Sequence, residues 1–262
     1  MRPLTAITLT LIVTLTTFGA GPSAPRARQP PPQTQTAAAE DLDALNRRVR
    51  ELYEAKKYEE ASKLAQTALA SAESQTGPDS LETGAALMNL ASVQVARQDL
   101  TKAKKSLARL VEMRAKRTGP SRKFEQSALE LFTCIDASNL RGGPDLEMSR
   151  RIYRILVEDS VLEQGYRLSP DKAELKIGES LSKPQPEYPP RAREAGARGA
   201  VVLRITIDEE GRVVEALPLG CSVKALVEAA VRAARLATFK PTMVSGKPVE
   251  VRGIMFYRFV IM

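Results

Sequence analysis

The chain has 262 residues, with 39 Lys and Arg against 31 Asp and Glu, so its formal net charge is +8 at neutral pH. This length predicts one or two domains, and a hydrophobic content of 43% is sufficient for packed cores. Histidine is absent, which excludes Ser-His-Asp triads, Cys–His nucleophiles and histidine metal ligands. Two cysteines are too few for a thiolate zinc site, and we expect no disulfide framework. The composition favours a protein-binding function without enzymatic activity, cofactor or metal.

The N-terminus has the layout of an export signal. Arg2 precedes the uncharged residues 4–18, and small residues follow at 19–24, where a signal peptidase cuts. The uncharged run is shorter than the roughly 20 residues of a spanning helix. Residues 1–24 are therefore predicted to be a signal peptide or an inner-membrane anchor, which directs the protein to the periplasm. Residues 25–39 are rich in Pro, Gln, Thr and Ala and are expected to form a disordered linker.

Residues 40–159 contain an internal repeat. Gly77-Pro78 recurs 42 positions later as Gly119-Pro120, and Ala61 recurs as Ala103 at the same offset. Apolar residues within each unit are three and four positions apart, which predicts two amphipathic helices per unit. A third, degenerate unit is expected to end with a helix over residues 146–158.

This pattern resembles the tetratricopeptide repeat (TPR) in a 42-residue variant. The resemblance implies a concave groove that binds a protein or peptide, and the alternative is an array that only spaces or dimerises the protein. Ten basic residues between Arg97 and Lys123 accompany two acidic ones. This run is a solvated helix face or a docking patch for an acidic partner or anionic lipid. Nucleic acid is disfavoured, because the N-terminus indicates export.

Residues 160–182 are expected to be a connector, and residues 183–262 to form a second domain. After a proline-rich start, the pattern predicts a short helix at 191–195, a hairpin of strands at 200–208 and 212–217, a helix at 223–239 and a long strand at 249–261. This order predicts a small α+β domain in which a helix packs on a three-stranded antiparallel sheet. The acidic cluster Asp208-Glu209-Glu210 is read as a solvated hairpin turn, not a metal loop.

Aromatic, proline, glycine and alanine residues are spaced along this second domain: Tyr188, Pro189, Ala192, Gly196, Gly199, Gly211, Ala230, Phe239, Pro241, Gly246 and Pro248. Together with the alternating run 201–207 and the closing Tyr257-Arg258-Phe259, they resemble the TonB C-terminal domain. We expect them to be mainly structural, with the glycines in turns.

The resemblance implies binding to outer-membrane transporters or similar periplasmic partners, with a partner segment added as a strand to the sheet edge. The residues of the candidate edge strand are Val249, Val251, Gly253, Met255, Tyr257 and Phe259. Energy transducers of the family have a membrane helix with a functional His and a long proline-rich spacer, and this sequence has neither. Energy transduction therefore depends on retention of the N-terminal segment in the membrane. The alternative is a soluble periplasmic TPR scaffold without energy coupling.

The two cysteines are 87 positions apart in the sequence. Cys134 is expected to be a buried, unreactive thiol in a helix, and Cys221 a small buried or helix-capping residue. A disulfide between them is the alternative, which export permits.

Overall fold

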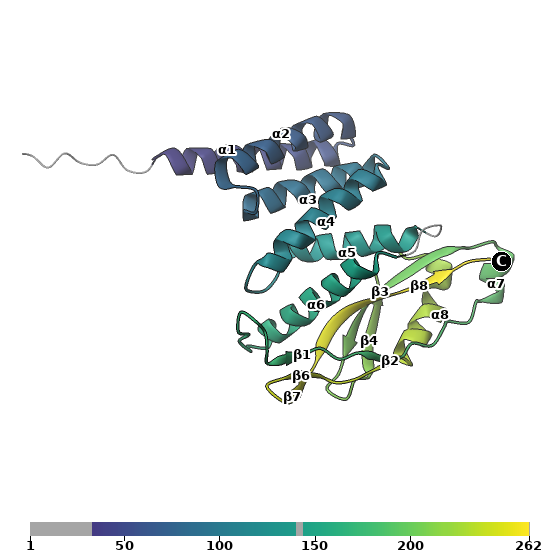
Figure 1. Cartoon of the computed structure of the whole chain (residues 1–262). Coiled ribbons are helices and arrows are strands. Elements are labelled where there is room, and N and C mark those ends of the chain that lie inside the picture. The colour runs from purple at the N-terminus through teal and green to yellow at the C-terminus, as the bar shows by residue number, and fades with distance from the viewer. Residues whose placement is uncertain (1–32, 140–143, 262) are drawn as a thin grey trace, which may run out of the picture.

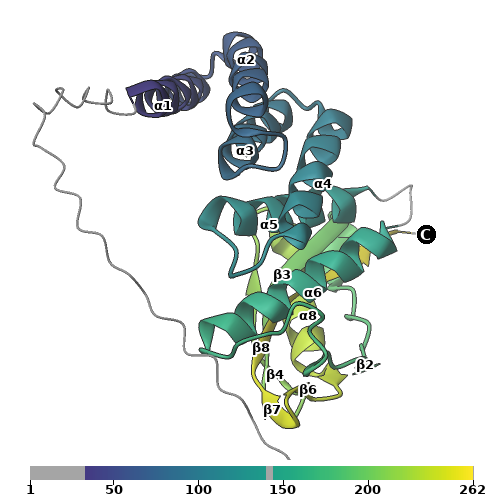
Figure 2. The same ribbon diagram turned by 60° about the vertical axis from the view of Figure 1, so that its left-hand side comes forward.

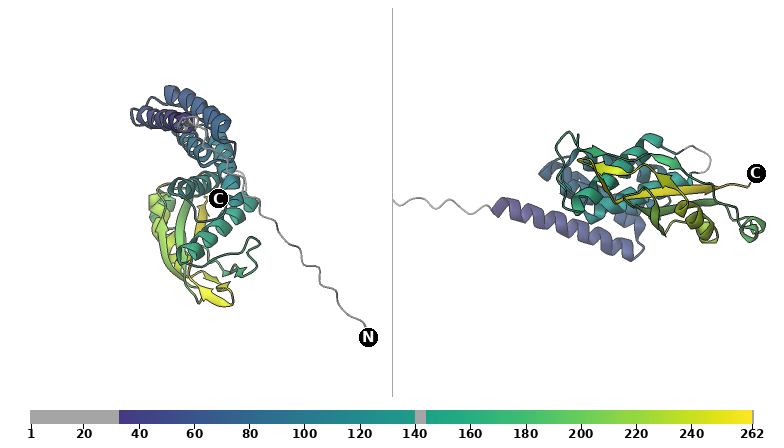
Figure 3. Two further views of the ribbon diagram at one scale, coloured as in Figure 1. Left: turned by 90° about the vertical axis from the view of Figure 1, so that its left-hand side faces the viewer. Right: turned by 90° about the horizontal axis from the view of Figure 1, so that it is seen from below.

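The computed structural model describes residues 33–139 and 144–261, and the segment predicted to direct export lies outside them (Figure 1). Six helices stack as antiparallel pairs before the sheet: α1 (Gln33–Glu54), α2 (Tyr58–Thr76), α3 (Leu81–Ala96), α4 (Leu100–Lys116), α5 (Lys123–Ser138) and α6 (Leu146–Glu163). Figure 3 shows α1 to α4 extending away from the C-terminal sheet, which lies beside α5 and α6. The predicted fold class, helical repeats followed by an α+β domain, is confirmed.

Small residues and glycine turns explain how the helix pairs pack. Ala61 and Ala103 have no exposed surface, and at both positions the missing side-chain bulk lets adjacent helices approach closely. Gly77 and Gly119 follow α2 and α4 with φ values of 94° and 87°. This left-handed conformation is costly for residues with a Cβ, so the recurring glycines mark equivalent turns of the two repeats.

A buried ion pair fixes α6 against the preceding repeat. Arg114 of α4 and Asp159 of α6 are each 1% exposed, and their side chains are joined at 2.6 Å. The Arg114 guanidinium also donates to the carbonyls of Arg117 and Gly119, while Asp159 accepts from the backbone N–H of Ser121. The pair therefore holds the α4–α5 loop onto α6.

We expect Asp159→Ala to lower the free energy of unfolding by about 3 kcal/mol, because it leaves the Arg114 charge buried without its partner. The matched control is Asp79→Ala, which removes an ion pair to Lys116 whose side chains are 58% and 67% exposed. That exposed pair contributes less than about 1 kcal/mol. Urea unfolding of both variants measures the difference, and equal losses would contradict the role assigned to Asp159.

The C-terminal sheet has the order β4-β3-β8 and is antiparallel throughout. Its strands are β3 (Gly199–Ile207), β4 (Val213–Pro218) and β8 (Val251–Phe259), and the flanking helices are α7 (Pro190–Glu194) and α8 (Lys224–Arg235). The short strands are β1 (Leu175–Lys176), β2 (Ser180–Ser182), β5 (Thr238–Phe239), β6 (Thr242–Val244) and β7 (Lys247–Val249).

Four predicted elements differ in detail from the structure. The linker expected over residues 25–39 overlaps α1, which begins at Gln33, and the alanines at 37–39 favour a helix there. The segment 160–182 contains the last turn of α6 and two strands, β1 and β2, which pair with β6 and β5. The helix expected to reach Phe239 ends at Arg235, because residues 238–239 pair with β2. The final strand starts at Val251, because Val249 belongs to β7, which returns from β6 through Ser245 and Gly246. Both turn residues have positive φ, as tight hairpins require.

Helices cover both faces of the sheet (Figures 1 and 2). One face, including Val201, Leu203 and Met255, packs with the alanine-rich side of α8. The other face places Ala200 and Val202 against Ala137 of α5. The sheet is therefore a shared core element of the two halves of the chain.

A disulfide joins the helical repeats to the C-terminal domain. Cys134 of α5 is bonded to Cys221, which lies between β4 and α8, with a Cα–Cα distance of 6.0 Å. The expectation of two separate thiols was wrong, and Cys221 is also exposed. The reason is tertiary: α5 packs on the sheet and brings Cys134 to the β4–α8 loop.

We expect the double variant Cys134→Ser/Cys221→Ser to lose about 2–4 kcal/mol of stability, because the bond closes a long loop and restricts the unfolded chain. Reduction of the native chain before urea unfolding should reproduce the loss, while the double variant should not respond to the reductant. Equal midpoints for the oxidised and reduced native chain would contradict this expectation.

Burial of Tyr257 makes the stability of the core depend on pH. Its side chain is 2% exposed and its hydroxyl is without a hydrogen-bond partner among the described residues. Burial raises the pKa of Tyr257 to about 12. The unfolded chain, with a tyrosine pKa of about 10, therefore loses the proton first, and stability falls as the pH rises above about 10.

We expect Tyr257→Phe to be at least as stable as the native chain near pH 8, since it removes an unsatisfied buried hydroxyl. It should also lose less stability than the native chain near pH 11. Urea unfolding of both proteins at the two pH values checks this, and an identical alkaline loss would contradict it.

Candidate partner-binding site

The six residues of the candidate edge strand are all buried. Val251, Met255, Tyr257 and Phe259 belong to the core under α8, and Val249, in β7, belongs to it too. Gly253 is buried, and a Cβ there would lie 3.0 Å from the Tyr153 ring of α6. Because these side chains form the core, recognition of a partner at this edge depends on the backbone of β8 and on the side chains of its even-numbered residues.

The outward backbone groups of β8 are those of its even-numbered residues. The N–H of Arg252 donates to Ser160 Oγ of α6 at 2.9 Å, so Arg252 points away from β3. In an antiparallel ladder every second residue shares this direction, which places the N–H and C=O of Ile254 and Phe256 at the outer edge. The pairing of β8 with β3 leaves these groups unused.

Part of this edge is already occupied by the same chain. The Gln164 side chain donates to the carbonyl of Glu250 at 2.7 Å, and the Lys183 ammonium donates to that of Phe256 at 3.0 Å. In the part of the chain that the structure describes, the N–H and C=O of Ile254 and the N–H of Phe256 have no such partner. The edge is sealed at residues 250–252 and open around residue 254.

A groove opens at this unsealed part of β8. It has a volume of about 830 Å³, and its walls are the first half of α6 and the segment 177–183. This is within the range of roughly 300–1,000 Å³ typical of ligand-binding pockets. Apolar side chains line much of it: Tyr153, Ile177, Ile205, Phe239, Ile254, Met255 and Phe256. Burial raises the pKa of Tyr153, whose hydroxyl lies 3.5 Å from the carbonyl of Gly178.

The charge around the groove is mainly positive. Arg150 and Arg154 are exposed and have no acidic partner among the described residues. The Lys183 ammonium lies 5.3 Å from the ring centre of Phe256 and 5.0 Å from that of Tyr257, and burial lowers its pKa. Among the lining residues the carboxylate is Glu179, which pairs with Lys240.

Comparison with known families identifies this sheet. The family model for the Gram-negative bacterial TonB protein C-terminal region matches residues 184–261, and a tetratricopeptide repeat model matches residues 42–116. Residues 184–261 are a TonB C-terminal domain. The solution structure of the Pseudomonas aeruginosa TonB C-terminal domain is 27% identical, over 35% of this chain and 91% of that one, with a TM-score of 0.28. No curated protein matches the chain.

The family assignment supports a TonB-like envelope protein built from protein-interaction or transducer domains. Within the described residues, none of the helices is both long enough and apolar enough to cross a membrane. In the same part of the chain, no cluster of three or more Cys, Asp or Glu is arranged to hold a metal ion.

The family positions of the TonB C-terminal domain lie in turns and in the core. The Tyr188 hydroxyl donates to the carbonyl of Ala197, and its ring meets Phe259 edge-on at 5.4 Å. Gly211 has a φ of 82°, and a Cβ there would overlap the carbonyl oxygen of Phe239. The remaining positions are buried (Ala192, Ala230, Phe239), have positive φ (Gly196, Gly199, Gly246), or lie next to or within short elements (Pro189, Pro241, Pro248).

Asp208 is more buried than a solvated turn predicts. Its carboxylate accepts from the N–H groups of Glu210 and Arg212 and from the Arg212 guanidinium. Burial alone would raise the pKa of Asp208, but these hydrogen bonds hold it below its usual value. Asp208 therefore fixes the β3–β4 turn, while Glu209 and Glu210 are exposed.

The other edge of the TonB C-terminal domain is less suited to strand addition. β4 has a register shift opposite Thr206 and Ile207 and ends at Pro218, which has no N–H. Such irregularities limit pairing along an edge. This leaves the open part of β8 as the better candidate.

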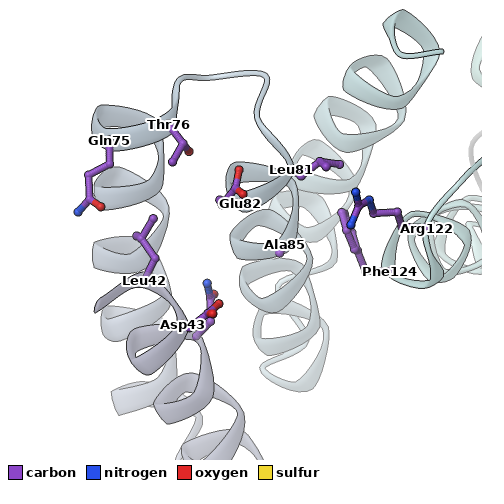
Figure 4. Close-up of a pocket in the computed structure, with 10 residues that line it drawn as sticks. Leu42, Asp43, Gln75, Thr76, Leu81, Glu82, Ala85, Arg122 and Phe124 are labelled. Carbon is purple, nitrogen blue, oxygen red and sulfur yellow. The ribbon is translucent and has the colours of Figure 1, made fainter. Parts of the chain in front are cut away.

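A second cavity lies among the helical repeats (Figure 4). Its volume is about 470 Å³, and residues from α1, α2, α3 and the start of α5 surround it. Asp43 and Glu82 line it together with Arg122, so its charge does not indicate a class of ligand. The sequence identified the β8 strand, whereas Arg150, Arg154 and Lys183 were not singled out, because no local pattern places α6 beside β8.

Proposed function

We propose that the protein is an exported, non-enzymatic TonB-like protein that binds a periplasmic segment of an outer-membrane transporter, or of a similar envelope protein. The partner segment adds as a strand to the outer edge of β8. The observation that supports this most directly concerns three outward backbone groups of β8: the N–H and C=O of Ile254 and the N–H of Phe256. They have no partner among the described residues, and they face a groove of about 830 Å³. Backbone pairing supplies affinity in this mode, and pockets for alternate side chains supply specificity.

In this proposal residues 40–159 are the repeat domain, 160–182 the connector and 183–262 the partner-binding domain. Residues 1–24 direct export, and the part of the predicted linker that precedes α1 acts as a tether. Energy transduction would require residues 1–24 to remain in the inner membrane. The absence of His and of a long proline-rich spacer favours the second candidate, a periplasmic adaptor whose repeats bind another protein without energy coupling.

The test is backbone amide exchange measured by NMR on the full chain, with synthetic peptides that span the periplasmic segments of outer-membrane transporters. Strand addition should slow the exchange of the Ile254 and Phe256 amides at least tenfold, because they gain acceptors. The amides of Gly253 and Met255, on the β3 side of the ladder, serve as the internal control and should be slow with or without peptide. A peptide that binds without protecting Ile254 and Phe256 would contradict strand addition at β8.

A further inference from the structure

The groove on β8 is formed by both halves of the chain. The third helical repeat contributes α6, with Arg150 and Arg154, and the segment before the TonB C-terminal domain contributes Ile177, Glu179 and Lys183. The family-matched residues begin only at 184, so both walls lie outside the region that defines the family, while Ile205, Phe239 and the β8 residues of the groove lie within it. The selectivity of this groove is therefore a property of this chain rather than of the isolated TonB-like sheet.

The arginines of α6 are not equivalent. Arg151 is paired with Glu112 of α4 and Glu147, on the side of α6 that faces the repeats. Arg150 and Arg154 are one helical turn apart and line the groove without a partner among the described residues. Two unpaired guanidinium groups beside an apolar floor favour carboxylates on the ligand, since an arginine fork matches a carboxylate.

We propose that the groove selects an acidic, extended protein segment, with carboxylates on Arg150 and Arg154 and an apolar side chain on the floor beside Tyr153. This rests on the proposed strand addition and specifies the chemistry of the partner. Lys183 lies at the far end of the open edge, where its ammonium donates a hydrogen bond to the carbonyl of Phe256.

Two occupants that this protein itself could supply, its N-terminal segment and a second copy of the chain, fit the groove poorly. Residues 1–39 contain Arg2, Arg26 and Arg28 and no Asp or Glu, so the N-terminal segment has the wrong charge for this groove. A second copy carries the same net charge of +8, which opposes self-association through a basic site. The occupant is therefore a segment of another protein.

The experiment compares two labelled peptides, acetyl-Glu-Val-Glu-Val-Glu-amide and acetyl-Lys-Val-Lys-Val-Lys-amide, by fluorescence anisotropy with the full chain. We expect at least tenfold tighter binding of the Glu peptide and a weaker preference at high salt. Arg150→Glu/Arg154→Glu should abolish or reverse the preference. The control Lys224→Glu/Arg235→Glu, with the same charge change on exposed positions of α8, should retain it.

Amide exchange of the complex separates this inference from the proposed function. Protection of Ile254 and Phe256 with equal affinity for both peptides would overturn the acidic preference and leave strand addition in place. A Glu preference without that protection would overturn both, since the charge would then act away from the edge. Complete displacement of the Glu peptide by millimolar inorganic phosphate would also overturn the inference, because the groove would then recognise only an anion.

Discussion

The packing of α6 along β8 is the contact on which the rest of this structure depends. Val157 and Val161 of α6 are fully buried in the same core as α8 and the sheet, while Ile152 and Ile155 belong to the core of the repeats. One helix thus supplies apolar residues to both halves, and the buried Arg114–Asp159 pair fixes its position against the second repeat. Because α6 is shared, the repeats and the TonB C-terminal domain are not independent domains joined by a flexible linker.

The contact between α6 and β8 also determines which backbone groups at the edge of the sheet remain accessible. An uncovered edge strand exposes a row of backbone donors and acceptors that invites nonspecific pairing, and proteins commonly cover such edges with a helix. Here α6 covers one end of β8 through Ser160 and Gln164 and diverges enough to leave a groove at the other end. A partly covered edge protects the free protein from nonspecific pairing and still leaves room for the proposed strand addition. The position of α6 also places Arg150 and Arg154 of the repeat domain beside the proposed binding site.

The Cys134–Cys221 disulfide and the ion pairs across the two halves reinforce the same arrangement. Arg204 of β3 pairs with Glu130 of α5, and the guanidinium of Arg258 donates to the carbonyl of Asp136. These links lie on the face of the sheet opposite α8, so α5 and α6 hold the sheet from one face and one edge. A rigid connection of this kind is consistent with the proposed adaptor role, in which the repeats and the sheet would each bind a partner.

The sequence by itself determined the long helices, the three long strands and the resemblance to the two families, but not the short strands β1, β2, β5 and β6. These features are visible in the order of residues along the chain: the 42-residue repeat, the alternation in 201–207, and the glycines and prolines at turns. Helix and strand periodicity and turn geometry depend on residues that are close in sequence, so no tertiary information is needed to detect them. The tertiary structure alone decided the disulfide, the sealing of β8 and the basic groove. Each of these joins residues far apart in the chain, such as Ser160 with Arg252 and Cys134 with Cys221. Local patterns carry no information about which surfaces of two domains meet, because that choice is made by the complementarity of whole faces.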